Sequence, residues 1–274
     1  MFVDMINILR KMKRTILAQT VKISIVTSAA ERKLEGETIL ITGGATGIGR
    51  ATAQAAITQS AEVIIMGRRE ELLKKTCREL GNEHCRYFVC DVTSVEDYAL
   101  LWEKLETIYN KRITAIVCNA GVYVHKSPLD FDSKDFEKCI STNLKAPFFM
   151  IQQYVKYCEN HGNSGNIVVT ASNRGLMGDF GPYGVSKAGI INYIQGMARE
   201  YVLKEIRINA VAPGMTASEI NHVDIEGDLY TSSVRGKRIL VPQEIAEVIC
   251  FLLSKNSKCI TGAVIPCDEG DSLR

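Results

Sequence analysis

Several features that would mark a special class of protein are missing from this chain of 274 residues. No stretch free of Lys, Arg, Asp and Glu reaches the roughly 18 residues that a membrane-spanning helix requires. The nine cysteines are an odd number and form no C-x-x-C pair, which argues against a disulfide framework. Most of them lie inside apolar runs, so we expect reduced core thiols in a cytoplasmic protein.

Composition and length also exclude disordered and fibrous proteins. Hydrophobic residues make up 46% of the chain and charged residues 23%, as in an ordinary globular protein. A chain of this length buries roughly three quarters of the surface that it exposes when unfolded. It can therefore form a full core without metal ions or disulfides, and we expect no metal site.

The positive charge is confined to the N-terminus. Residues 1–34 hold seven basic and two acidic side chains, a net charge of +5, whereas residues 35–274 hold 26 basic and 29 acidic ones, a net charge of −3. We therefore expect residues 1–34 to be a basic extension and residues 35–274 to be a single domain. The slightly acidic domain gives no reason to expect a nucleic-acid partner.

Within the extension, apolar residues recur at helical spacing among basic ones (Met5, Ile8, Leu9, Met12 and Ile16, with Arg10, Lys11, Lys13 and Arg14). This pattern is typical of a helix on an anionic membrane surface, so peripheral membrane contact through residues 1–30 is one interpretation. A helix packed on a neighbouring subunit, or a mobile leader, is the favoured alternative. A mitochondrial leader stays open, although Asp4 and the lack of a Ser-rich stretch weaken it.

From Thr38 onward, short β-branched runs alternate with segments of helical period. The predicted strands are Thr38–Thr42, Glu62–Met66, Tyr87–Cys90, Ala115–Asn119, Asn166–Thr170, Arg207–Ala212 and Ala263–Pro266. The predicted helices are Ile48–Thr58, Arg69–Leu80, Val95–Tyr109, Ser133–Cys158, Tyr183–Leu203 and Pro242–Leu253. Apolar strands separated by helices are typical of a parallel sheet covered on both faces. We expect an α/β, Rossmann-type doubly wound sheet of about seven strands.

A glycine-rich turn follows the first predicted strand, with the sequence Thr42-Gly43-Gly44-Ala45-Thr46-Gly47-Ile48-Gly49. Glycines between a strand and a helix let the backbone approach a pyrophosphate, which the free N–H groups of the helix N-terminus attract. Gly43, Gly47 and Gly49 are therefore the first candidates for cofactor binding, with Thr46 and Ile48 of the same turn. Their G-x-x-x-G-x-G spacing resembles the glycine motif of the short-chain dehydrogenase/reductase family.

Two arginines, Arg68 and Arg69, follow the second predicted strand. An enzyme that uses NAD(H) normally has an acidic residue at this corner, where it binds the ribose hydroxyls. Guanidinium groups instead suit the 2′-phosphate of NADP(H), because they donate paired, charge-assisted hydrogen bonds to phosphate. We therefore expect NADP(H) to be favoured over NAD(H), with Arg68 the stronger candidate. A solvated arginine pair at a helix start is the alternative.

Further segments match the family in the same order. Asp91 and Val92 follow the third strand, and the resemblance implies that Asp91 accepts a hydrogen bond from the adenine amino group. An N-cap role for Asp91 or Thr93 is the local alternative. Asn119-Ala120-Gly121, after the fourth strand, is similar to the N-A-G motif of the family and adds these three residues to the expected cofactor site.

Toward the C-terminus, Pro213 and Gly214 follow the sixth strand and resemble the turn that closes over the nicotinamide. The resemblance implies that Thr216 contacts the carboxamide or a phosphate. Residues 260–270 resemble the closing strand of the family, with Glu269 in place of one glycine.

The most specific motif is Tyr183-Gly184-Val185-Ser186-Lys187, which sets a phenol and an ammonium one helical turn apart, about 5–6 Å at Cβ. The ammonium favours the phenolate and is expected to lower the pKa of Tyr183 toward working pH. A general acid/base for alcohol–carbonyl interconversion requires such a group. By itself the motif also occurs on solvated helix faces, so its context matters.

Two residues complete the set that the resemblance implies. Ser172 follows the fifth strand and matches the family serine that hydrogen-bonds the substrate oxygen, with Thr170 as a second hydroxyl nearby. Asn143 matches the asparagine that holds a water for a proton relay through Lys187. The resemblance thus implies hydride transfer between NADP(H) and a carbonyl or secondary alcohol, with Tyr183 as acid/base and Lys187 on the nicotinamide ribose.

Other functions and substrates stay open. An NADP(H)-binding sensor or scaffold without turnover is the alternative, and a sugar-nucleotide epimerase of the extended branch is disfavoured by the glycine spacing. The segment Thr216–Val241 is mixed in polarity, so a 3-oxoacyl thioester, a sugar or polyol, and a small ketone all fit as substrates. The resemblance also implies a homodimer or homotetramer, formed through the two longest predicted helices.

Overall fold

The computed structural model describes residues 32–162, 164–218 and 228–273. Their centre is one seven-stranded sheet in the order β3-β2-β1-β4-β5-β6-β7, in which all neighbouring strands are parallel. The strands are β1 Thr38–Thr42, β2 Glu62–Gly67, β3 Cys85–Val89, β4 Ala115–Cys118, β5 Gly165–Thr170, β6 Ile206–Pro213 and β7 Val264–Cys267. The predicted α/β doubly wound sheet is confirmed. The predicted helix within residues 1–30 lies outside the described residues.

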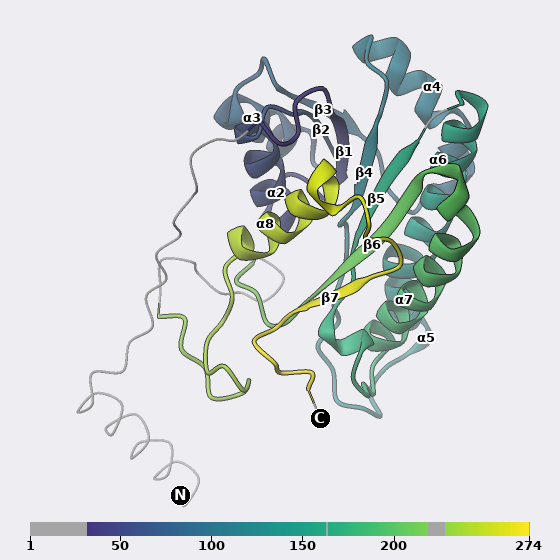
Figure 1. Ribbon diagram of the computed structural model, residues 1–274. Helices are drawn as coiled ribbons and strands as arrows, with labels where there is room; N and C mark the ends of the chain where they lie inside the picture. The colour runs from purple at the N-terminus through teal and green to yellow at the C-terminus, as the bar shows by residue number, and fades with distance from the viewer. Residues whose placement is uncertain (1–31, 163, 219–227, 274) are drawn as a thin grey trace, which may run out of the picture.

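Helices cover both faces of the sheet (Figure 1). One layer holds α2 Gly47–Thr58, α3 Glu70–Leu80 and α8 Pro242–Leu253, and the other holds α4 Tyr98–Tyr109, α5 Ser133–Ile140, α6 Ala146–Asn160 and α7 Pro182–Tyr201. Parallel strands need such crossover connections, because a tight hairpin joins only antiparallel strands. Each layer encloses its own hydrophobic cluster against the sheet.

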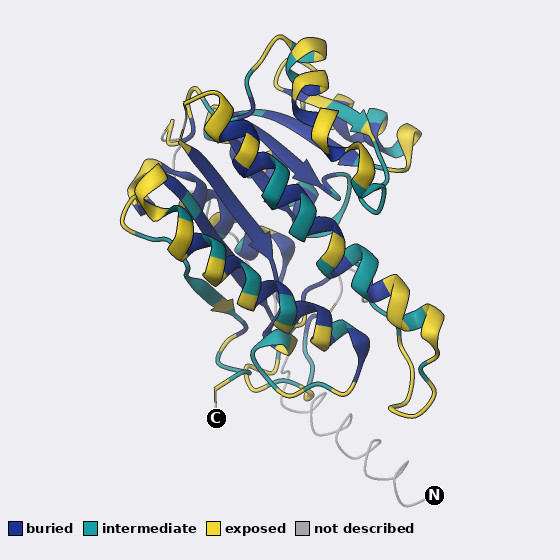
Figure 2. Ribbon diagram, turned by 90° about the vertical axis from the view of Figure 1, so that its right-hand side faces the viewer, coloured by how far each residue is buried: buried dark blue, intermediate teal, exposed yellow. Residues whose placement is uncertain are grey.

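Alternate residues of each strand face opposite layers. In β4, Ile116 and Cys118 belong to the cluster beneath α4, α6 and α7, whereas Ala115 and Val117 belong to the cluster beneath α2, α3 and α8. All four are buried, as are the central strands in Figure 2. The central strands are mostly apolar because both faces of the sheet are covered.

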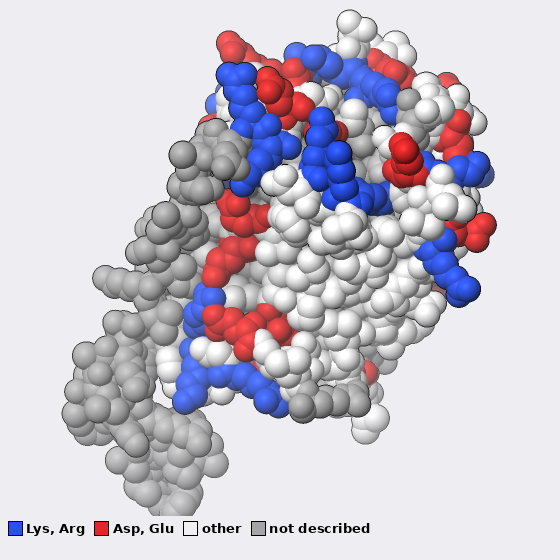
Figure 3. Space-filling view, viewed as in Figure 1, with Lys and Arg blue, Asp and Glu red and all other residues white. Residues whose placement is uncertain are grey.

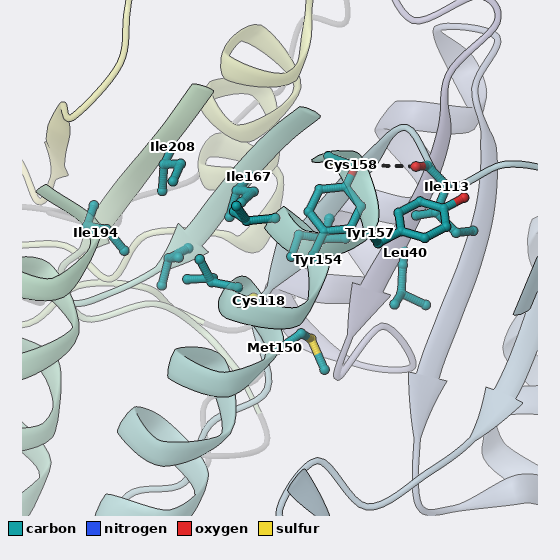
Figure 4. Close-up of a cluster of buried hydrophobic side chains, with 14 of the residues drawn as sticks. Leu40, Ile113, Cys118, Met150, Tyr154, Tyr157, Cys158, Ile167, Ile194 and Ile208 are labelled. Atoms are coloured by element: carbon teal, nitrogen blue, oxygen red, sulfur yellow. Dashed lines mark hydrogen bonds between the residues drawn. The ribbon is translucent and has the colours of Figure 1, made fainter. Parts of the chain in front are cut away.

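Aromatic side chains anchor α6 in the cluster shown in Figure 4. The ring centres of Trp102 on α4 and Tyr154 on α6 lie 5.1 Å apart. The Tyr154 phenol donates to the carbonyl oxygen of Ile113 at 3.3 Å, so the buried hydroxyl has a partner. Met150 also belongs to this buried cluster. The helix that follows Asn143 is therefore held firmly against the sheet.

One predicted helix is interrupted. The range Ser133–Cys158 is occupied by α5, by the π-helical turn Ser141–Lys145 and by α6. In the π turn the N–H of Ala146 donates to the carbonyl of Ser141, five residues back. Pro147 is a physical cause, because it lacks the N–H that would bond to the carbonyl of Asn143 and its ring crowds that carbonyl. The other predicted elements agree with the structure to within three residues at each end.

No described residue forms a disulfide among the nine cysteines, and six of these thiols are buried, as the sequence predicts. Within residues 32–273, as far as they are described, no helix has the length and apolarity to cross a bilayer.

Charged side chains gather along the upper and left-hand rims in Figure 3, and the area over β7 and α7 is mostly uncharged. Oligomer formation stays a prediction.

Two polar side chains of the sheet close the C-terminal end of α8. Arg207 of β6 donates to the carbonyl oxygens of Leu252 at 3.0 Å, Ser254 at 3.2 Å and Ser257 at 3.1 Å. Asn166 of β5 donates to the carbonyl oxygen of Leu252 at 3.1 Å as well. The last carbonyls of a helix lack partners within it and carry partial negative charge, which a guanidinium satisfies.

Replacing Arg207 with Met is expected to lower the free energy of unfolding by about 2–4 kcal/mol, because several carbonyls lose their charged partner at once. Urea denaturation measures this loss. Arg199→Met, at an exposed position of α7, is the matched control and is expected to change stability by less than about 0.5 kcal/mol. Equal effects of the two substitutions would contradict the capping role of Arg207.

Candidate active site

The candidate site lies along the carboxyl edge of the parallel strands. Ligands of open α/β sheets bind at this edge, beside the point where the strand order reverses. Here the order reverses at β1, whose neighbours are β2 and β4. Apart from the residues on α7 and in the π turn, every predicted site residue follows the end of a strand or lies at its last position.

The turn between β1 and α2 has a shape that requires its glycines. Gly43 and Gly47 have φ values of +64° and +52°, in the left-handed region that favours glycine. A Cβ on Gly49 would lie 2.3 Å from the carbonyl oxygen of Gly43, so only glycine lets α2 start this close to the turn. Thr46 precedes α2 without a side-chain cap, and the first turn of the helix holds no acidic residue. This N-terminus suits a phosphate.

Ile48, predicted with the same turn, packs against the hydrophobic cluster beneath α2. Its backbone carbonyl accepts the hydroxyl of Thr52 at 2.8 Å. Ile48 thus shapes the turn through packing, and its side chain is directed to the core rather than to the sheet edge.

The structure brings Arg68 and Asp91 together at the corner beside β2 and β3. The Arg68 guanidinium lies 3.7 Å from the Asp91 carboxylate, and 72% of the Arg68 side chain is exposed. Asp91 also accepts the N–H and the hydroxyl of Thr93 at 2.9 Å and 2.8 Å. Thr93 and Arg68 hold the pKa of Asp91 below its ordinary value. Arg69 takes the N-cap position of α3, and both arginines are exposed.

Asn119 ties three strands together. Its side-chain N–H donates to the carbonyls of Thr42 at 3.1 Å and Gly43 at 3.3 Å, and its side-chain oxygen accepts the hydroxyl of Thr170 at 3.2 Å. The Thr42 hydroxyl in turn accepts the backbone N–H groups of Asn119 and Ala120, each at 2.9 Å. The side chain of Asn119 therefore fixes the glycine turn, a role that the motif alone did not indicate.

Two other predicted residues, Val92 and Ala120, line a small hollow together with Thr42 and Tyr98. The carbonyl of Val92 accepts the phenol of Tyr98. Both predicted residues thus border the space next to the first strand.

Tyr183 and Lys187 lie side by side at the start of α7. Lys187 Nζ is 5.6 Å from the centre of the Tyr183 ring and donates to the carbonyl of Thr170 at 2.7 Å. Lys187 is 4% exposed, and burial lowers its pKa to about 8. Burial raises the pKa of Tyr183 above its ordinary value, and a hydrogen bond with Ser172 opposes the rise.

The expectation that Lys187 lowers the pKa of Tyr183 is therefore wrong for this structure. Lys187 is buried and Tyr183 is half-buried, and loss of water disfavours phenolate and ammonium alike. The lysine ammonium is directed to a backbone carbonyl and not to the phenol oxygen.

Ser172 is 6% exposed and starts the 3₁₀ turn Asn173–Gly175 directly after β5. Its hydroxyl accepts the N–H of Arg174 at 3.2 Å. A Cβ on Gly175 would lie 2.7 Å from the carbonyl carbon of Lys187, so glycine allows this turn to pack onto α7. Thr170, the other candidate hydroxyl, is engaged with Asn119, which leaves Ser172 as the hydroxyl that meets Tyr183.

Asn143 lies in the π turn and is 1% exposed. Its side chain accepts the N–H of Val122 and donates to the carbonyl of Val122, each at 2.9 Å, and it donates to the hydroxyl of Ser186 at 3.2 Å. A Cβ on Gly121 would lie 3.4 Å from Asn143 Oδ1 and 3.8 Å from Lys187 Nζ. Gly121 thus lies next to both Asn143 and Lys187.

The segment after β6 holds three further predicted residues, Pro213, Gly214 and Thr216. Thr216 is 4% exposed, and its hydroxyl donates to the carbonyl of Gly214 at 3.0 Å. Pro213 is the last residue of β6, and the N–H of Gly214 donates to Cys267 of β7 at 3.0 Å. These three residues lie at the sheet edge, where the structure directs the Thr216 hydroxyl to the chain's own backbone.

Sequence reasoning missed three residues of this site. The ring of Tyr123 meets the ring of Tyr183 edge to face, with centres 4.9 Å apart. Ser186 links Asn143 to the carbonyl of Tyr183, to which it donates at 2.6 Å. Thr42 organises the Asn119 turn. Ser186 lies inside the Tyr-Lys motif and Thr42 opens the glycine turn, so position could have indicated both, whereas no pattern marks Tyr123.

The arrangement combines a phosphate-binding turn with a proton-transfer group. An uncapped helix N-terminus beside close-packed glycines can hold the phosphates of a dinucleotide, and a phenol beside an ammonium and a hydroxyl can give a proton to an oxygen. No cluster of His, Cys, Asp and Glu that could hold a metal ion occurs among the residues described.

The chain is similar to known proteins over most of its length. A 3-oxoacyl-(acyl-carrier-protein) reductase of Thermotoga maritima is 34% identical over 244 residues, which cover 87% of this chain and 98% of the relative. An NADP-dependent (R)-specific alcohol dehydrogenase of Lentilactobacillus kefiri is 30% identical over 247 residues, covering 87% of this chain and 97% of the relative. The crystal structure of levodione reductase matches with a TM-score of 0.78 at 28% identity, covering 87% of this chain and 98% of that one.

A family model described as short chain dehydrogenase matches residues 37–228. This range contains the glycine turn, the Asn119 turn and the Tyr183–Lys187 pair. The parallel sheet and the similar proteins agree with this family match. The chain therefore belongs to the short-chain dehydrogenase/reductase family, whose members are oxidoreductases that act on CH–OH and C=O groups with NAD(P)(H).

Proposed function

We propose that this protein is an NADP(H)-dependent oxidoreductase that transfers hydride between the nicotinamide and a carbonyl or secondary alcohol, with Tyr183 as general acid/base. The observation that carries the proposal is the grouping of Tyr183, Lys187 and Ser172 at the end of β5. Lys187 is held 2.7 Å from the carbonyl of Thr170 and 5.6 Å from the ring centre of Tyr183, and Ser172 meets the phenol.

Each side chain has one role in the reduction of a carbonyl. Burial keeps Tyr183 protonated at neutral pH, so the phenol holds the proton that the substrate oxygen takes. Ser172 donates a hydrogen bond to the same oxygen as its charge develops. Lys187, held by the carbonyl of Thr170, contacts the nicotinamide ribose. Asn143 is fixed by hydrogen bonds to Val122 and Ser186. It holds the water through which Lys187 returns a proton to Tyr183.

The residues present fit the dinucleotide. Gly43, Gly47 and Gly49 leave the backbone bare beside the uncapped N-terminus of α2, where the pyrophosphate would lie. At the corner after β2 the exposed Arg68 suits a 2′-phosphate, and Asp91 lies beside it for the adenosine. When bound, the nicotinamide supplies or accepts the hydride.

Relatives suggest which substrates to test. Their names describe 3-oxoacyl-(acyl-carrier-protein) reduction, (R)-specific alcohol oxidation and glucose oxidation. We therefore propose a screen of 3-oxoacyl thioesters, sugars or polyols, and small ketones. Because all nine cysteines are free thiols, a reducing compartment such as the cytosol suits the protein.

Arg68→Ala tests the cofactor preference. It is expected to weaken NADPH binding about tenfold and to leave NADH binding within about twofold, because only NADPH loses a charge-assisted contact to its phosphate. Fluorescence titration of each nucleotide measures both constants. Lys75→Ala, on the neighbouring helix α3, is the control for a general change of charge. Preference for NADH in the unmodified protein would contradict the role given to Arg68.

Tyr183→Phe tests the acid/base. The variant is expected to lose at least about 100-fold in kcat for NADPH-dependent reduction and to bind NADPH unchanged, because only the transferable proton is removed. Tyr123→Phe is a matched control: it also removes one phenol, from the ring that touches Tyr183, and is expected to retain kcat within a few-fold. Tight NADPH binding without turnover of any substrate class would favour the sensor or scaffold instead.

Lys187 predicts a pH dependence of stability. Its pKa is about 8 in the folded protein and about 10.5 in the unfolded chain, so between these values the unfolded state binds more protons and stability rises with pH. The stability of the unmodified protein relative to Lys187→Met is expected to increase by about 2 kcal/mol between pH 7.5 and 9.5. Urea denaturation at both pH values measures the difference. A constant difference would mean that Lys187 keeps an ordinary pKa.

A further inference from the structure

The chain ends in a compact turn, residues 268–273, that touches two sides of the candidate site. We name it the C-terminal turn. Asp268, 6% exposed, accepts the backbone N–H groups of Gly270 at 3.1 Å and Ser272 at 2.8 Å and so folds the turn. Glu269 has a φ of +53°, in the left-handed region, where the family motif has glycine. Glycine would adopt this backbone conformation without strain, but the chain has a glutamate here.

The carboxylate of Asp271 joins two separate segments. Its Oδ2 accepts the side-chain N–H of Asn173 at 3.2 Å, and its Oδ1 accepts the backbone N–H of Arg235 at 3.2 Å. Asn173 directly follows Ser172, is 5% exposed, and has its Oδ1 3.5 Å from the Ser172 hydroxyl. A buried amide needs a partner, and the C-terminal turn supplies it.

A second contact holds the same segment. Arg238 donates to Glu269 and to the two carboxylate oxygens of Glu244, at 2.8 Å and 2.7 Å, and its side chain is 17% exposed. A Cβ on Gly236 would lie 2.8 Å from the Cβ of Glu269, so a larger residue at 236 would force the Glu269 side chain to shift.

From Arg238 the chain runs directly to the sheet edge. The N–H of Leu240 donates to the carbonyl of Met215 at 2.9 Å, and Leu240 pairs with Thr216. The apolar packing of residues 228–241 includes the small cluster Ala217, Leu229, Ile239 and Val241. Leu240 also belongs to the cluster beneath α2, α3 and α8, and Arg238 binds Glu244 of α8. Polar contacts with the C-terminal turn add to what holds the segment in place.

We propose that Asp271 is a positioning residue for this site: it orients Ser172 through Asn173 and holds residues 228–241 against the sheet edge. Its effect on turnover rests on the proposed function of Ser172, whereas its hold on residues 228–241 does not. One carboxylate serves both segments, so loosening the C-terminal turn disturbs the candidate serine and the enclosing segment together.

Asp271→Asn is the first test. The new amide oxygen can accept only one of the two hydrogen bonds, from Asn173 or from Arg235. The new amide N–H group then faces the other donor, so that bond is lost. We expect KM for the carbonyl substrate to rise about tenfold and kcat to fall several-fold, with the NADPH dissociation constant within about twofold. Ser272→Ala is the matched control, because Ser272 contributes its backbone N–H to the contacts described above. Equal kinetics of the two variants would overturn the proposal.

A swap variant separates positioning from general damage. In Asn173→Asp with Asp271→Asn, the new carboxylate at 173 accepts the amide N–H at 271, and the amide oxygen at 271 accepts the N–H of Arg235. Both hydrogen bonds are restored, so KM is expected to return to within about threefold of the original value. Failure of the swap to recover any of the loss would contradict the bridge.

Trypsin gives a readout that needs no turnover. Cleavage after Arg235 and Lys237 is expected to quicken about tenfold in Asp271→Asn, with an unchanged urea midpoint, and to slow again in the swap variant. Faster cleavage in an enzyme that reduces no carbonyl would support the hold on residues 228–241 while the proposed function fails. Unchanged cleavage would overturn that hold even if the proposed function stands.

Discussion

Burial of both faces of a parallel sheet is the constraint on which the rest of this molecule depends. Positions of the central strands face one helix layer or the other, so polar side chains are costly there and most of them lie near the strand ends. Thr42, Thr170 and Asn119 show the consequence, because each belongs to a strand end and each is hydrogen-bonded there. The same network that satisfies these groups fixes the turns around the cofactor position.

Burial also explains why the pKa of Tyr183 is raised, although a neighbouring lysine was expected to lower it. Lys187 is buried beside the end of β5, and its charge is supported by one carbonyl at 2.7 Å. Burial destabilises both its ammonium and the phenolate of Tyr183. A phenol that keeps its proton until an adjacent oxygen takes it is useful in carbonyl reduction, because deprotonation in advance would leave nothing to donate. Desolvation that is costly for stability thus suits the proposed chemistry.

The sequence predicts those features that depend on residues close together in the chain, and it misses those that depend on contacts between distant segments. Gly43 and Gly49 were identified because a turn between strand and helix restricts which residues fit, and the Tyr183–Lys187 pair because helical spacing is local. The π turn at Asn143 was missed, although Pro147 is in the sequence, since proline predicts a disturbed helix but not its form. Tyr123 and the side-chain role of Asn119 depend on segments brought together only by folding, and so does the pKa of Tyr183.

The C-terminal turn shows what a departure from a motif can indicate. At Glu269 the sequence differs from the family pattern by one residue, which by itself suggests a neutral change. In the structure the residue adopts a left-handed backbone conformation and its carboxylate meets Arg238. Backbone strain of this kind persists only where surrounding contacts compensate for it. The substitution and its partner are therefore a single feature, and Gly236, which packs against the Glu269 side chain, belongs to it. A residue that breaks a motif is best understood together with the contact that it makes possible.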